Sequence, residues 1–134
     1  MAATRDLHAL LVGLRPALAP GAYAFLALPD GVAVDPAKIV ASVREPEGLS
    51  LIVPEDVAHA LGLPIVFRAA WITLTVQSDL AAVGLTAAVS RALADAGIGC
   101  NVVAGVHHDH LFVPFDAAQA AMDVLRVLSQ SARA

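Results

Sequence analysis

The sequence contains a single cysteine, few basic residues and no targeting signal, and each shortage excludes a class of protein. With Cys100 alone, neither a disulfide within the chain nor a zinc site built from several cysteines can form. Eight of the 134 residues are lysine or arginine, against twelve acidic residues, which gives a net charge of -4. Because no basic run is present to neutralise a phosphate backbone, we expect no nucleic-acid partner.

Membrane and export signals are also missing. The first residues lack the charged and apolar regions of a signal peptide, and no apolar run reaches the roughly 18 uninterrupted residues of a membrane helix. We therefore expect a cytoplasmic protein with no membrane partner. The chain is nevertheless 58% hydrophobic and only 15% charged. This balance predicts one compact unit or two small halves, with some apolar surface buried in a homodimer.

The C-terminal half shows the pattern strand, helix, strand, strand, helix. Alternating apolar residues predict a strand over residues 70–77, and Ser78 or Asp79 is expected to cap the first helix. Gly97 is expected to end that helix, and Gly105 to lie between two strands, residues 98–104 and 110–115, that form a hairpin. The expected buried stripes are Leu80, Val83, Ala87, Ala88 and Leu93 in the first helix, and Ala118, Ala121, Met122, Leu125 and Leu128 in the second.

The N-terminal half has a related but shorter pattern. Strands are predicted at residues 22–28, 38–44 and 49–53, a short helix at 55–61 between Pro54 and Gly62, and a strand resuming at 65–67. No helix pattern separates the first two strands, which indicates a degenerate copy of the C-terminal unit. The C-terminal unit in turn lacks a last strand, and we expect the apolar residues 7–14 to supply it.

This order of elements resembles an ACT domain over about residues 66–128. The resemblance depends on the Gly84-Leu85 pair at the start of a helix, the Ala96-Gly97-Ile98 turn into a strand, and a hairpin in which Asp109 precedes the apolar residues 111–113. It is closest to small bacterial tandem ACT proteins and to the ACT modules of CASTOR-type arginine sensors and aspartate kinases. It implies an α+β, ferredoxin-like ACT fold in tandem, with a degenerate N-terminal unit at 1–65 and an ACT domain at 66–134.

The resemblance also implies a ligand site. In CASTOR-type modules the hairpin acid that matches Asp109 faces the bound arginine, while backbone matching Gly84, Gly99 and Cys100 helps to form the pocket. Leu85 and Asn101 adjoin these positions, so the implied ligand-binding set is Gly84, Leu85, Gly99, Cys100, Asn101 and Asp109. The acid expected two positions before the helix glycine is Ala82, which speaks against arginine itself.

Three of these residues have a structural interpretation beside the functional one. Asp109 is either a ligand for an amino group or a turn residue that accepts bonds from local backbone amides. Gly84 either lets two helices pack closely or lets a ligand approach the backbone. A nucleophilic Cys100 would need a lowered thiol pKa and an adjacent base, and a thiol in an apolar strand is more often inert packing.

The chain's histidines are concentrated in the hairpin, where His107, His108 and His110 surround Asp109. On a continuous strand His108 and His110 share one face and His107 and Asp109 the other, so at most two histidines converge. A tetrahedral metal site would need further ligands such as His8 or His59. We therefore favour structural or solvent-exposed histidines and expect no bound metal, no cofactor and no catalytic residue.

The sequence thus predicts a non-catalytic regulatory module that binds a small amino acid or related metabolite at an interface between ACT units. One alternative is a structural or protein-interaction module without a small ligand. Another is a metal-dependent enzyme that uses residues 107–110.

Overall fold

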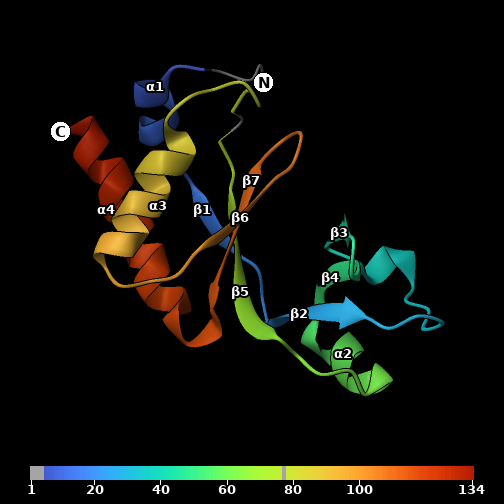
Figure 1. Ribbon diagram of the computed structural model, residues 1–134. Coiled ribbons are helices and arrows are strands. Elements are labelled where there is room, and N and C mark those ends of the chain that lie inside the picture. Colours follow the sequence, from blue (N-terminus) through green and yellow to red (C-terminus); the bar gives the residue numbers. More distant parts are fainter. Residues whose placement is uncertain (1–4, 77) are drawn as a thin grey trace.

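The computed structural model of the protein describes residues 5–76 and 78–134, and Figure 1 shows its elements along the chain. The helices are α1 (Leu7–Val12), α2 (Glu55–Leu61), α3 (Leu85–Asp95) and α4 (Ala118–Arg133), with 3₁₀ turns η1 (Pro36–Lys38) and η2 (Phe115–Ala117). The strands are β1 (Pro16–Leu18), β2 (Tyr23–Leu28), β3 (Ala41–Glu45), β4 (Gly48–Pro54), β5 (Phe67–Leu74), β6 (Asn101–Ala104) and β7 (Asp109–Pro114).

One antiparallel sheet connects both halves, in the order β3-β4-β2-β5-β7-β6, with β1 added beside β5. The first residues of β5 pair with β2, and its last residues pair with β1. Each half therefore has four strands in the same order, β5-β2-β4-β3 and β1-β5-β7-β6, so that β5 belongs to both. This is the strand order of a ferredoxin-like unit repeated twice, and it confirms the predicted α+β class.

The N-terminal segment completes the C-terminal half, but through different residues from those predicted. Residues 7–14 are not a strand, because Leu7–Val12 is helical and the added strand is Pro16–Leu18. Asp6 begins the helix by accepting a bond from the backbone N–H of His8 at 3.1 Å. Leu10 and Leu14 then both point into the core. An apolar run this short fits the periodicity of a strand as well as that of a helix, and the N-terminal cap by Asp6 favours the helix.

The start of α3 also differs from the prediction. Leu80 and Val83, expected in a buried helical stripe, lie in the preceding loop with 67% and 85% of their surface exposed. Asp79 does not cap the helix, since its carboxylate accepts from the N–H of Ala81 at 2.7 Å within that loop. The helix begins after Gly84, whose φ of 108° is outside the helical region. Gln77, predicted to end the strand before this loop, lies outside the described residues.

Other elements match their predictions closely. Helix α2 spans residues 55–61 as expected and ends at Gly62, which has a left-handed conformation. Gly97 ends α3, because the N–H of Ile98 bonds to the carbonyl of Leu93 at 2.9 Å as in a Schellman motif. The β6–β7 hairpin through Gly105 is confirmed as well.

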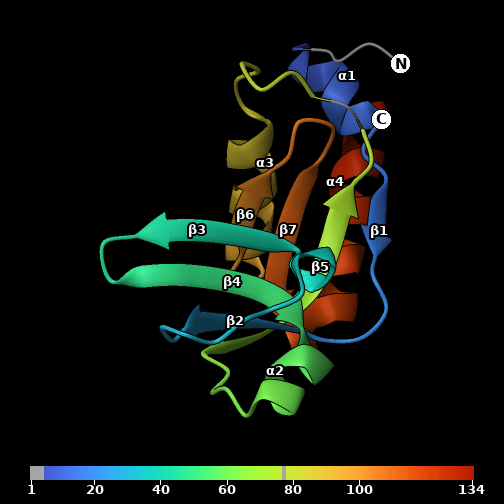
Figure 2. The same cartoon turned by 90° about the vertical axis from the view of Figure 1, so that its right-hand side faces the viewer.

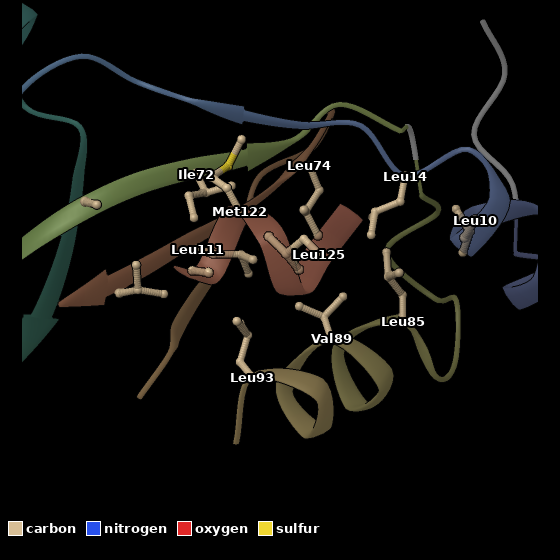
Figure 3. Packing of buried hydrophobic residues seen from close by; sticks show 13 residues of the cluster. Leu10, Leu14, Ile72, Leu74, Leu85, Val89, Leu93, Leu111, Met122 and Leu125 are labelled. Carbon is tan, nitrogen blue, oxygen red and sulfur yellow. The ribbon is translucent and has the colours of Figure 1, made fainter. Parts of the chain in front are cut away.

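The largest core lies under three helices of the C-terminal half. Figure 3 shows Leu14 beside Leu74 of β5 and Leu125 of α4, with Leu10 of α1 next to Leu85, and all of them belong to the same cluster as Ile72. Helices α1, α3 and α4 cover this face of the sheet (Figure 1). In the described residues no helix combines the length and apolarity that a membrane crossing requires.

The N-terminal half covers one face of its strands with α2 and with the segment that follows β2. Ala24, Leu26, Leu51 and Val53 are buried there. Between β2 and β3 the chain forms only the short turn η1 rather than an α-helix. Figure 2 shows β2, β3 and β4 running across the direction of β5, β6 and β7. The uncovered faces of the two halves therefore approach each other around Ile52, Ala69 and Phe112.

Candidate functional site

The hairpin carboxylate Asp109 contacts the loop that leads into α3. Asp109 is the first residue of β7, lies between Leu74 of β5 and Ala104 of β6, and is half-buried. The Ser78 hydroxyl donates to Asp109 Oδ2 at 3.1 Å. The loop and the hairpin are therefore held together at this end of the sheet. Ser78 was not among the predicted site residues, since only the pairing of β5 with β7 brings it close to Asp109.

Gly84 and Leu85 follow the same loop but face α1 and the core. A β-carbon on Gly84 would lie 2.9 Å from Leu7 Cδ2, so that the positive φ and the close approach of α1 both favour glycine here. Leu85 is buried in the core beneath the helices. The close-packing interpretation of Gly84 thus has a direct structural basis, namely contact with Leu7.

Gly99, Cys100 and Asn101 lie beyond the opposite end of α3. That helix has 11 residues, which corresponds to a length of about 16 Å. Asn101 is exposed and begins β6, which is an edge of the sheet. Cys100 packs against the helix-covered core, and its burial raises the pKa of the thiol. Within one chain, the six predicted residues therefore divide into two groups, with Gly84, Leu85 and Asp109 in one and Gly99, Cys100 and Asn101 in the other.

The histidines of the hairpin occupy three different environments. His107 and His108 lie in the loop before β7, so the two-face arrangement expected for a continuous strand applies only to Asp109 and His110. Trp71 Nε1 donates to His110 Nδ1 at 3.0 Å, and Thr73 Oγ1 lies 3.1 Å from the same nitrogen. Because an indole N–H can only donate, this Nδ1 accepts and the ring is neutral.

Burial, and then the nearby His108, lower the pKa of His110, while Asp109 opposes this shift. Among residues 5–76 and 78–134, no group of three or more histidine, cysteine or acidic side chains is placed to hold a metal ion.

A groove of about 290 Å³ lies between the uncovered faces of the two halves. Its walls are mainly apolar and come from β2, β3, β4, β6 and the segment before β5, and they include Phe25, Val43, Ile52, Val66 and Val103. Phe25 also meets Phe112 edge-on at 5.4 Å between ring centroids. None of the six residues predicted to bind a ligand lines this groove. This groove was not predicted from the sequence. The alternation of residues 23–28 predicts a strand, but it does not show which face of the sheet has no helix covering it.

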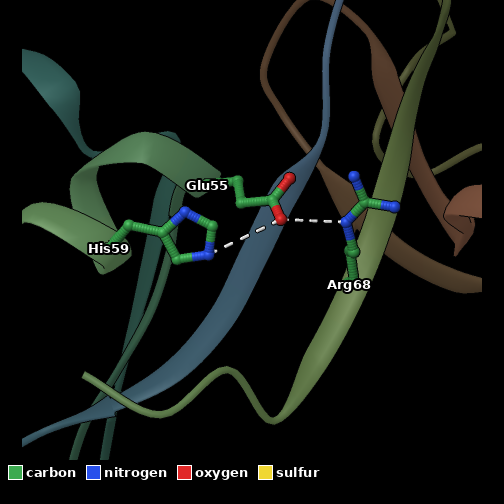
Figure 4. Close-up of polar contacts among 3 residues, drawn as sticks. All are labelled: Glu55, His59 and Arg68. Atoms are coloured by element: carbon green, nitrogen blue, oxygen red, sulfur yellow. Dashed lines mark hydrogen bonds and ion pairs between the residues drawn. The ribbon is translucent and has the colours of Figure 1, made fainter. Parts of the chain in front are cut away.

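A second polar cluster connects α2 to β5, as Figure 4 shows. The Glu55 carboxylate accepts from Arg68 Nε at 2.9 Å, and His59 Nε2 lies 3.7 Å from the same oxygen. The hydrogen bond from Arg68 is the main cause that holds the pKa of Glu55 below its usual value. Arg68 also stacks over the Phe115 ring at 4.0 Å. Because the Glu55 carboxylate is anionic and paired with Arg68, it links α2 to β5 and is poorly suited to abstract protons.

Comparison with known proteins gives two matches to one family. A sequence model described as ACT domain matches residues 2–70, and a second model with the same description matches residues 66–127. No curated protein is significantly similar to the chain.

Solved structures with the same fold superimpose on most of the chain. Protein VC0802 from Vibrio cholerae is 40% identical to this chain and superimposes with a TM-score of 0.81. The match covers 92% of this chain and 95% of VC0802, which is a protein of unknown function described as a possible transport protein. Atu0741 from Agrobacterium tumefaciens is 21% identical (87% and 89% covered, TM-score 0.62). The ligand-free regulatory subunit of aspartate kinase from Thermus thermophilus is 13% identical (84% and 95% covered, TM-score 0.62) and shares the fold.

Proposed function

Since this chain belongs to the ACT domain family, we propose that it is a non-catalytic regulatory module that binds a small amino acid or related metabolite. Its fold is that of aspartate kinase regulatory subunits, which makes regulation by a small ligand the natural starting hypothesis. The observation that carries the proposal is the meeting of the loop before α3 with the hairpin at Ser78 and Asp109. A half-buried carboxylate at such a junction can accept charge-assisted bonds from an amino group.

The second half of the proposed site comes from another copy of the chain. Strand β6 is an edge strand with unpaired backbone groups, which makes it suited to pairing with a second β6. Antiparallel pairing centred on Val102 would place Cys100 of one chain opposite Ala104 of the other. Ala104 is itself the cross-strand neighbour of Asp109.

In that homodimer, Cys100 would lie two strand spacings, about 10 Å, from Asp109 of the second copy and on the same face of the sheet. An amino acid can bridge a gap of this size. The proposed site thus contains Asp109 and the backbone at Gly84 and Leu85 from one chain, and Gly99, Cys100 and Asn101 from the other. The two groups separated by α3 in one chain then converge between two chains.

Calorimetric titration with the twenty amino acids tests this proposal. Asp109→Asn removes the charge and keeps an oxygen that can accept from Ser78, so that the variant should stay folded. We expect it to bind the ligand roughly 10- to 100-fold more weakly, as is typical for the loss of a charge-assisted hydrogen bond. The matched control is Asp95→Asn on the exposed side of α3, where the carboxylate pairs with Arg91, and it should bind like the parent protein.

Ala104→Pro tests the role of the β6 edge. The alternation of the hairpin ladder turns the N–H of Ala104 away from β7, so proline removes an outward donor and no bond inside the sheet. We expect a monomer by light scattering, with amino-acid affinity lost. If the parent protein binds no amino acid at millimolar concentration, or if Asp109→Asn binds as well as the parent, the ligand-binding proposal fails.

The apolar groove favours one alternative, a protein-interaction module without a small ligand. Its exposed valines, Val43 and Val66, are 58% and 77% exposed, which is costly unless a partner covers them. A parent protein that binds no amino acid but forms a stable complex with an enzyme would support this alternative. We further propose that 1–65 and 66–134 are the two units of the tandem, and that the first unit is degenerate because η1 replaces its first helix.

A further inference from the structure

Three arginines gather around one small cavity on the far side of the C-terminal half from the hairpin strands. The cavity has a volume of about 210 Å³ and lies between α4 and the connection from α1 to β1. Arg15 comes from the connection, and Arg126 and Arg133 lie seven residues apart on α4, where two turns bring them to the same side. The lining residues are Leu14, Arg15, Pro16, Arg126, Ser129, Gln130 and Arg133. Three of the chain's eight basic residues thus surround one cavity.

Backbone carbonyls hold two of these guanidinium groups in place. Arg15 Nη1 donates to the carbonyl oxygens of Val12 at 3.1 Å and of Leu14 at 3.0 Å. Arg133 Nη2 donates to the same Val12 oxygen at 3.3 Å, and the buried Ser129 hydroxyl donates to it at 3.3 Å. Arg133 also donates Nε to the Val12 oxygen at 3.4 Å and Nη2 to the Ser129 hydroxyl at 3.3 Å. Each guanidinium has five N–H donors, so Nε and Nη2 of Arg15 and Nη1 of Arg133 remain for another acceptor. The side chains are therefore ordered before any ligand binds, which reduces the entropy cost of binding.

Capping of α1 does not account for this arrangement. A carbonyl oxygen offers two lone pairs, whereas three side chains donate to the Val12 oxygen. Arg126 lies at the same cavity but pairs with Asp123 at 3.6 Å, through an exposed contact of the kind that contributes little. Among the described residues that line the cavity, none is acidic. In the part of the chain that the structure describes, Arg15 and Arg133 form no ion pair, so the cavity concentrates positive charge that an anion can neutralise.

We propose that this arginine cavity, formed by Arg15, Arg126 and Arg133, binds a phosphate group. Guanidinium forks match the oxygens of phosphate in geometry and charge, so Arg15 and Arg126 can each supply two parallel bonds, and Arg133 can add its Nη1 donors. The volume admits one such group with a small substituent. A nucleic-acid backbone is a poor occupant, because the basic residues form one cluster instead of a track. This site is separate from the proposed amino-acid site and does not depend on it.

Titration of the full-length protein with inorganic phosphate at constant ionic strength, adjusted with sodium chloride, tests the proposal. Arg126→Gln is the informative variant, since Arg126 holds no backbone carbonyl of α1 and its replacement should leave the fold intact. We expect phosphate affinity to fall about fivefold in this variant, as for loss of one partly exposed ionic contact, and further in Arg126→Gln with Arg133→Gln. Arg91→Gln is the matched control, because this exposed arginine also pairs with an acid on its own helix.

Two further ligands identify the source of the phosphate. Tighter binding of glycerol 3-phosphate than of inorganic phosphate, with no binding of glycerol, would indicate a phosphorylated metabolite. Equal binding of both phosphates would indicate the free ion. Absence of phosphate binding above the chloride background would overturn the proposal, as would equal loss of affinity in Arg91→Gln and Arg126→Gln. A normal amino-acid response in the same samples would show that the failure concerns this cavity alone.

Discussion

Replacing Leu14 by alanine tests whether the N-terminal segment is part of the C-terminal core. Leu14 is only 1% exposed and packs in the same cluster as Ile72 and Leu125, and its carbonyl oxygen accepts a hydrogen bond from the Ser129 hydroxyl at 3.4 Å. A buried Leu→Ala change costs about 2–5 kcal/mol, because it loses apolar contact and leaves a cavity. Total stabilities of domains are about 5–15 kcal/mol, so the loss should be a large fraction of the free energy of unfolding.

The matched control is Leu18→Ala, in the same segment but 41% exposed, for which we expect a cost of about 1 kcal/mol or less. Urea denaturation measures both, with Trp71 fluorescence and far-UV circular dichroism as probes. Trp71 is the chain's one tryptophan and lies on β5, the strand common to both halves. Equal costs below about 1 kcal/mol for the two variants would refute the packing of this segment into the core.

Three further predictions concern single groups. Because the folded state lowers the pKa of His110, its contribution to stability should be complete above about pH 6.5 and should be lost as the pH falls below that value. Urea denaturation between pH 7.5 and 5.5 measures this dependence of the unfolding free energy on pH, and His110→Gln should make it flatter. Gly84→Ala should cost more than Gly97→Ala in the same assay, since both have a positive φ but only Gly84 would also meet Leu7, and equal costs would argue against that contact. Burial raises the pKa of the Cys100 thiol, so alkylation at pH 8 should be at least about tenfold slower in the native than in the unfolded protein; equal rates would show an accessible, activated thiol.

Local signals in the sequence sufficed where one element is specified by its own residues. Helix α2 was predictable because Pro54 precedes it and Gly62 follows it, so both ends are marked. The hairpin around Gly105 was predictable for a similar reason. The apolar residues at 7–14 and 80–83 were misread, because periodicity over a few residues does not distinguish a helix from a strand, or a buried residue from an exposed one.

Long-range features could not be read from local patterns. Sharing of β5 between two units depends on pairing with β1 and β2, and nothing within residues 67–74 specifies those partners. The arginine cavity joins Arg15 to Arg133 across most of the chain, so neither composition nor spacing indicates it. Asp109 was identified as a candidate through the family resemblance, whereas its contact with Ser78 required the fold.

Ligand-dependent stability of the parent protein tests the regulatory proposal most directly. Thermal unfolding should be followed with each of the twenty amino acids at millimolar concentration, and with divalent metal ions for comparison. A ligand at 100 times its Kd stabilises the native state by about 2.7 kcal/mol. We expect at least one amino acid to raise the Tm, and Asp109→Asn to make this increase much smaller. A protein whose Tm changes with none of the amino acids would contradict the regulatory proposal.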